Sequence, residues 1–128
     1  MIDRDNLVLS IRNSIPNIVE DCNSELESFQ NKTLRPILKF QNKLTLLLLK
    51  DSKGFNLLEE ISNSEEYVKQ LKLFVDKNLK LKNQIVATVS ALFTTDEFAF
   101  YIQNKREVSK RILSMQSKRY RDELVSNC

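Results

Sequence analysis

The stretch TLRPILKFQNKLTLLLLKDS, which runs from Thr33 to Ser52, decides the fold class of this protein. Its apolar side chains recur at spacings of three and four residues, which is the period of one face of an α-helix. Pro36 is compatible with a helix that begins at Thr33, because the first turn of a helix does not use the N–H that proline lacks. Gly54 follows the stretch and suits the position just after a helix ends. We therefore predict one amphipathic helix over 33–52.

Helical spacing also recurs before and after this stretch. Leu7, Ile11 and Ile15 lie four residues apart, as expected for one face of an N-terminal helix. A second, acidic helix is expected over 17–30, and a last helix over 105–125. The spacing of apolar residues therefore predicts helices at both ends of the chain as well as in the middle.

The uncharged segment 83–95 is expected to form the central buried helix. Its β-branched residues would also suit a strand, but its apolar side chains keep a helical spacing. Capping boxes mark two helix starts, Asn63 with Glu66 and Thr94 with Glu97. We predict an all-α protein, a single compact bundle of five to seven helices that forms one domain over residues 1–128.

The composition excludes several classes of protein. The 128 residues include one glycine, two prolines and no histidine. Tight β-hairpins need residues with positive φ, so a sandwich or barrel is not expected. Glycine-rich phosphate loops are absent, and catalysis or metal binding through imidazole is ruled out. We expect no catalytic residue, no metal site and no cofactor, and an enzyme would have to gather carboxylates, lysines, tyrosines or Cys22 in a pocket.

The cysteine pattern and hydropathy indicate a cytoplasmic protein. Cys22 and Cys128 do not form a disulfide framework, which suits a reducing compartment. The first residues lack the pattern of a signal peptide. The longest aliphatic run, 46–49, is far shorter than the roughly 20 residues that span a bilayer, so no membrane contact is expected.

Charge is unevenly distributed along the chain. Residues 1–31 carry two basic and six acidic side chains, whereas 32–53 carry six basic and one acidic, and 105–128 carry seven basic and three acidic. On the 33–52 helix one edge is wholly basic, and Lys32 extends it by a turn. The basic candidates on this edge are Lys32, Arg35, Lys39, Lys43 and Lys50, and those on the last helix are Arg106, Lys110, Arg111, Lys118 and Arg121.

Two interpretations of the basic edge remain open. In the first, the acidic 17–30 helix packs alongside and neutralises the edge with Glu20, Asp21, Glu25 and Glu27. In the second, the edge meets an external polyanion or an acidic partner helix. The other side of the 33–52 helix is apolar and is expected to be buried; it includes Leu34, Ile37, Leu38, Phe40, Leu44, Leu47, Leu48 and Leu49.

Some apolar side chains fall outside these expected buried faces. Leu46 lies within the basic edge, Phe100 points away from its apolar neighbours, and the last helix has a second apolar stripe made of Leu113, Tyr120 and Leu124. Either all of them pack into one core, or they form an exposed interface, for example between two copies of the chain.

Three short segments resemble a known group of proteins. The segments are 31–39 (NKTLRPILK), 91–94 (ALFT) and 96–98 (DEF), and they are similar to those of short all-helical bacterial proteins, some of which carry the name glyoxalase. Glyoxalases of both common types bind a metal through histidine, which this chain lacks. The resemblance therefore implies a small all-α protein and no particular reaction.

These observations lead to two hypotheses about function. The first is a non-catalytic helical module that acts through protein–protein contact, with itself or with an acidic partner, and forms a dimer in solution. The alternative is a nucleic-acid-binding protein that uses the basic edge of 33–52 and the basic C-terminal helix.

Overall fold

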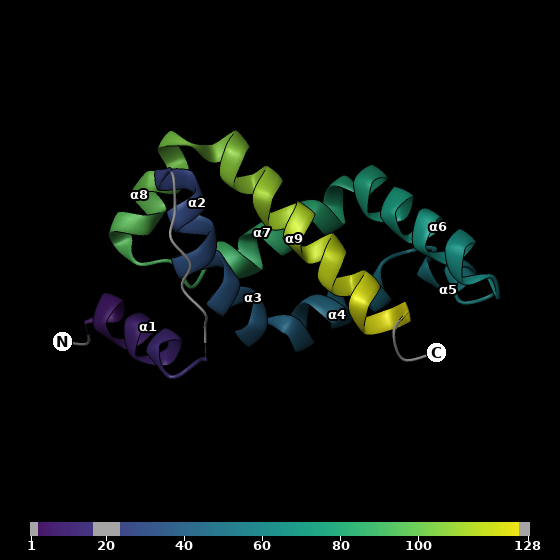
Figure 1. The fold of residues 1–128 in the computed structure, drawn as a ribbon, viewed down its shortest axis with the longest axis horizontal. Helices are drawn as coiled ribbons and strands as arrows, with labels where there is room; N and C mark the ends of the chain where they lie inside the picture. The colour runs from purple at the N-terminus through teal and green to yellow at the C-terminus, as the bar shows by residue number, and fades with distance from the viewer. Residues whose placement is uncertain (1–2, 17–23, 126–128) are drawn as a thin grey trace.

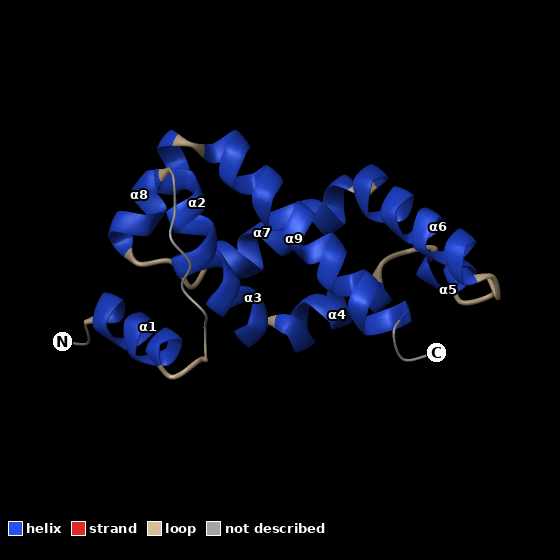
Figure 2. Cartoon of the chain, in the orientation of Figure 1, coloured by secondary structure: helices blue, strands red, loops and turns tan. Residues whose placement is uncertain are grey.

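The computed structural model describes residues 3–16 and 24–125, and within these ranges it contains helices and no strand (Figures 1 and 2). The fold class is thus all-α. The helices are α1 (Arg4–Asn13), α2 (Glu25–Phe29), α3 (Arg35–Phe40), α4 (Asn42–Asp51), α5 (Phe55–Leu58), α6 (Ser64–Lys77), α7 (Leu79–Ser90), α8 (Thr95–Gln103) and α9 (Lys105–Val125), and a π-helical turn, η1 (Gln30–Leu34), joins α2 to α3. Cys22, Cys128 and the first part of the expected 17–30 helix lie outside the described residues.

The prediction of one helix over 33–52 is wrong at both its start and its middle. The chain is already helical from Glu25, passes through η1 and α3, and breaks at Gln41, where φ is −91° and ψ is 5°. Pro36 has no N–H, so it cannot donate a hydrogen bond to the carbonyl one helical turn earlier. The π turn lies directly before this proline, and in it the Arg35 N–H donates to the Gln30 carbonyl, five residues earlier. This division explains why the described residues contain more helical segments than the five to seven expected.

The predicted helix ends agree well with the structure. Thr94 and Glu97 form the full capping box of α8, and the Asn63 side chain accepts a hydrogen bond from the Glu66 N–H at the start of α6. The expected end near Ser52 is also confirmed, since α4 stops at Asp51. Gly54 then turns the chain into α5 with φ of +91°, a left-handed conformation that favours glycine.

Helix α7 is the centre of the packing, as predicted for the segment 83–95, although it begins at Leu79 and ends at Ser90, so the predicted bounds are wrong. It contacts α4, α6 and α9, and it buries Leu81, Ile85 and Val89 completely. Figure 1 shows α9 crossing in front of α7, with α1, α2 and α8 at one end of the molecule and α5 and α6 at the other. The long α9 therefore links both halves of the fold.

Helix α1 is attached mainly through polar contacts. Its Leu7 and Ile11, expected to form a packed face, are exposed, and Val8 and Arg12 are buried instead. The Arg4 guanidinium donates two hydrogen bonds, from Nη1 to the Phe93 carbonyl at 2.7 Å and from Nη2 to the Ala91 carbonyl at 2.6 Å. An Asp5 carboxylate oxygen accepts a third from the Thr95 N–H at 2.9 Å. These contacts fasten α1 to the turn between α7 and α8.

A second contact of α1 centres on the carboxylate of Glu97. Arg12 donates to Glu97 Oε1 and forms an ion pair with it, Thr33 Oγ1 donates to Glu97 Oε2 at 2.9 Å, and the Thr94 N–H donates to Oε1 at 2.8 Å. Burial by itself raises the pKa of Glu97, but the hydrogen bonds and the Arg12 charge outweigh it and hold that pKa below its usual value. Glu97 thus joins α1, η1 and α8.

The inner face of α9 also encloses polar groups. The Tyr120 side chain is fully buried and its hydroxyl donates to the Thr45 carbonyl of α4 at 2.6 Å. Burial raises the pKa of the Tyr120 phenol, so the side chain stays neutral and can donate. Gln116, one turn earlier, is also fully buried, and within the described part of the chain neither its Nε2 nor its Oε1 has a hydrogen-bond partner.

None of the helices in the described ranges combines the length and the apolar character that a bilayer span requires.

Candidate functional site

A cationic groove of about 750 Å³ runs between α6 and α9. Its floor is apolar and consists of Val68, Leu71, Val75 and Leu113. Its walls carry five basic side chains and a single carboxylate: Lys72 and Asp76 from α6, Lys82 from α7, and Lys110, Lys118 and Arg121 from α9. We call this feature the α6–α9 groove.

The positive charges of the α6–α9 groove are poorly compensated inside the protein. Across residues 3–16 and 24–125, the ion pairs of the structure involve neither its four lysines nor Asp76. Arg121 contacts Asp122 at 3.4 Å, but both side chains are well exposed and such a pair is weak. Because opposite charge is scarce, the groove attracts anions.

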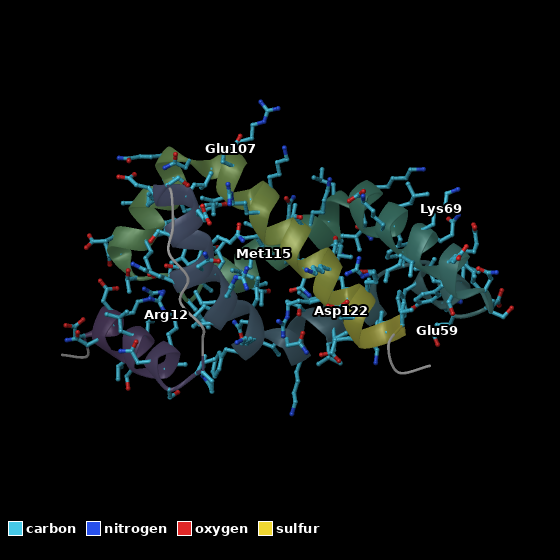
Figure 3. All side chains as sticks on the ribbon, in the orientation of Figure 1. Arg12, Glu59, Lys69, Glu107, Met115 and Asp122 are labelled. Carbon is cyan, nitrogen blue, oxygen red and sulfur yellow. The ribbon has the colours of Figure 1, made fainter. Side chains whose placement is uncertain are left out.

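A second, smaller groove of about 380 Å³ lies on the other side of α9, against α3. Arg35 and Lys39 of α3 face Lys118 and Arg119 of α9 across it, and Asp122 is its acidic residue. Met115 and Asp122, labelled in Figure 3, belong to its α9 wall. Ser114 and Lys118 line both grooves, so cationic grooves flank α9 on its two sides.

The structure disperses the basic edge expected on the 33–52 helix. All five basic side chains of this edge are exposed: Lys32, Arg35, Lys39, Lys43 and Lys50. Only Arg35 and Lys39 line the smaller groove, which lies between α3 and α9. Lys39 also donates to the Pro16 carbonyl at 2.9 Å. Lys50 lines a different cavity, between α5, α6 and the end of α9. The five residues are spread over η1, α3 and α4, so no single groove collects them. Of the acidic residues expected to neutralise this edge, Glu20 and Asp21 lie outside the described residues, and Glu25 and Glu27 lie in the first turn of α2.

The basic residues expected on the last helix divide into two groups. Lys110, Lys118 and Arg121 line the α6–α9 groove. Arg106 is exposed and lines neither groove of α9, and Arg111 is half-buried and donates to Gln30 Oε1 at 2.6 Å.

Sequence reasoning missed Lys72 and Lys82 as members of the groove. They belong to α6 and α7, which carry no basic stripe that stands out in the sequence. They join the groove only because α6 and α7 both pack against α9. No local signal identifies a site that depends on this packing.

The apolar side chains considered as an interface lie mostly within the core. Leu46, Phe100, Leu113 and Leu124 are half-buried and pack against it, and Phe100 stacks on Phe29 with 4.8 Å between ring centroids. Tyr120 is fully buried and is therefore not part of any surface.

The exposed apolar residues near this region are different ones. Phe40, Leu44 and Leu47, expected to be buried, are 51%, 51% and 63% exposed. The expected buried face is therefore confirmed in part. Leu34, Ile37, Leu38 and Leu49 are buried, whereas Phe40, Leu44 and Leu47, which lie together along one edge of that face, are exposed.

The basic side chains on the α9 side of the molecule can bind anions electrostatically. The chain has no histidine, and the described residues contain no cluster of three or more side chains that could hold a metal ion. The lysine ammonium groups, the arginine guanidinium groups and the hydroxyls of Ser114 and Ser117 are donors that suit carboxylates or phosphates. In comparisons with known proteins, no family model matches the chain, and neither a curated protein nor a solved structure is significantly similar to it.

Proposed function

We propose that this is a non-catalytic binding protein of the cytoplasm whose α6–α9 groove holds an acidic segment of a protein partner. One observation carries the proposal: five basic side chains and one carboxylate stand around an apolar floor. A partner must supply negative charge to match the walls and an apolar side chain to match the floor. An acidic amphipathic helix or turn has both.

The apolar floor favours a protein partner over a simple polyanion. Val68 and Leu113 are half-buried, so their remaining surface is open to contact from a partner side chain. A phosphate backbone would pair with the lysines but would leave this apolar surface uncovered. Burial of apolar surface together with charge pairing is the pattern that a helix-in-groove contact uses.

The proposal is tested by measuring how a labelled acidic amphipathic peptide, built from Glu and Leu, binds to the protein. Fluorescence anisotropy gives its affinity, and the same peptide with Gln in place of Glu is the reference ligand. We expect the acidic peptide to bind and the reference peptide not to. The variant Lys72→Glu/Lys118→Glu, which we call the groove variant, should weaken binding at least about tenfold, because it places like charges opposite the ligand.

The matched control is Lys53→Glu/Lys80→Glu, which changes the net charge equally through two exposed lysines outside the groove. It should bind the acidic peptide like the wild type. Failure of the wild type to bind the acidic peptide, or equal weakening by the control and the groove variant, would contradict the proposal.

A second candidate function, nucleic-acid binding, is favoured by the cationic grooves on both sides of α9. Arg35 and Lys39 flank α9 on one side, and Lys72 and Lys82 flank it on the other. Cations on both sides of a helix could contact the two backbones of a duplex when the helix faces a groove of about 12 Å width. Binding of this kind weakens steeply with salt, with a log–log slope near −0.9 per phosphate contacted. Absence of retention on duplex DNA at low salt would rule this candidate out.

A further inference from the structure

An acidic segment that matches the α6–α9 groove is present on the protein itself. Residues 59–66 contain four glutamates and no basic side chain, and Glu59, Glu60, Glu65 and Glu66 are all exposed. We call this segment the acidic corner. In the described part of the chain none of these four carboxylates belongs to an ion pair. Building on the proposed function, we propose that the partner in the groove is a second copy of this chain, which inserts its acidic corner.

The charges of the two features are equal and opposite. Five basic side chains and one carboxylate leave the groove with an excess of four positive charges, and the four glutamates give the corner four negative charges. Such complementarity directs encounter between surfaces and disfavours wrong arrangements. A contact between two copies therefore neutralises both features.

The shapes of the two features also suit each other. Figure 1 shows the turn between α5 and α6 at the end of the molecule opposite α1, and Figure 3 labels Glu59 at this end. The corner is thus a turn at the tip of the fold, followed by the first turn of α6. The groove, by contrast, is a depression between α6 and α9. A terminal turn of one copy can enter a depression of the other.

Both features border α6, which allows two copies to make the contact twice. Glu65 of the corner and Lys72 of the groove are seven residues apart on α6, so they lie on the same face about 10 Å apart along the axis. When two α6 helices run antiparallel, Glu65 of each copy lies beside Lys72 of the other. A closed twofold dimer, the commonest symmetric assembly, then pairs both corners with both grooves.

The inference is tested by reversing the charges of each feature separately. The groove variant is Lys72→Glu/Lys118→Glu, and the corner variant is Glu60→Lys/Glu65→Lys, which alters two exposed side chains that make no side-chain hydrogen bond in the described structure. Analytical ultracentrifugation at low salt should show a dimer for the wild type and for the control Lys53→Glu/Lys80→Glu. Each reversed variant alone should dimerise at least about tenfold more weakly, because like charges then face each other.

Mixing the two reversed variants provides the decisive measurement. The unchanged corner of the groove variant matches the unchanged groove of the corner variant, and the altered groove and the altered corner each have a net charge of zero, so they do not repel each other. An equimolar mixture should therefore regain the dimer that neither variant forms alone. Circular dichroism of each variant, with a helical signal equal to that of the wild type, shows that loss of dimer is not loss of fold.

Three results would overturn this inference: a monomeric wild type at high concentration and low salt, reversed variants that dimerise like the wild type, or a mixture that stays monomeric. The binding of the acidic peptide separates this failure from that of the proposed function. A monomeric wild type that still binds the peptide overturns the second copy as the partner and leaves the groove as an acidic-segment site. A true dimer, in contrast, should dissociate when the peptide is added in excess.

Discussion

Glu97 and Gln116 are both polar side chains enclosed between helices, yet their surroundings differ. The Glu97 carboxylate accepts hydrogen bonds from three partners, namely Arg12, the Thr33 hydroxyl and the Thr94 N–H, and the Glu97 backbone N–H donates to the Thr94 hydroxyl. The Gln116 amide is fully buried and has no hydrogen-bond partner among the described residues. Enclosing a polar group is costly unless its hydrogen bonds are replaced. The attachment of α1 at Glu97 therefore depends on polar contacts, whereas α4, α7 and α9 pack together despite the unpartnered Gln116.

The largest expected effect comes from removing the cation beside Glu97. Arg12→Met leaves a mostly buried carboxylate without its charge partner and should lower the free energy of unfolding by about 3 kcal/mol. Urea denaturation followed by circular dichroism measures this change. The double variant Arg12→Met/Glu97→Gln should recover part of the loss, because the uncompensated charge is gone. A loss well under about 1 kcal/mol in the single variant would show that α1 is not held by this pair.

The opposite sign is expected at Gln116. Gln116→Leu replaces an unpartnered buried amide by an apolar side chain of similar size and should raise the free energy of unfolding by about 1–2 kcal/mol. The same urea titration measures it. Gln103→Leu, at the exposed end of α8, is the matched control and should change stability little. A destabilised Gln116→Leu variant would mean that the amide is satisfied in solution, for example by a buried water.

A smaller loss is expected at the neighbouring hydroxyl. Tyr120→Phe removes the donor to the Thr45 carbonyl and should lower the free energy of unfolding by about 1 kcal/mol. Urea denaturation measures this loss. No change of stability in Tyr120→Phe would indicate that the buried hydrogen bond to Thr45 contributes nothing.

The smallest effect is a dependence of stability on pH through Glu97. The folded-state pKa of this carboxyl is below its ordinary value of 4.5, so the unfolded chain binds the proton more readily. The stability that the carboxylate contributes is then fully present above pH 4.5 and is lost as the pH falls through the folded-state pKa. Thermal melts of the wild type and of Glu97→Gln across this acid range should converge as the pH falls. Parallel curves would contradict the assignment.

The sequence was sufficient for the fold class and for most helix ends. The capping residues Asn63 and Thr94 act within a few residues and agree with the structure, and the spacing of 83–95 correctly indicates a helix there, although α7 ends at Ser90. The start and the internal division of the 33–52 segment were not predicted, because the spacing of apolar residues carries no signal for the π turn before Arg35 or for the break at Gln41.

The candidate site was only partly predictable for a related reason. Lys110, Lys118 and Arg121 are visible as a basic face of one helix. Lys72 and Lys82 join them only through the packing of α6 and α7 against α9, which depends on contacts between residues far apart in the chain. Periodicity identifies the faces of single helices, and it does not determine which faces meet.

The attachment of α1 has a consequence for how the chain acquires its structure during synthesis. The partners of Arg4, Asp5 and Arg12 in the α7–α8 region follow them by 85 to 90 residues. A ribosome adds about 5–20 residues per second, so α1 waits several seconds before its binding surface exists. Leu7 and Ile11 of α1 are exposed in the native structure as well. While α1 waits, it therefore exposes little apolar surface that folding will later bury. Helix α1 is therefore suited to docking last, after the rest of the chain has folded.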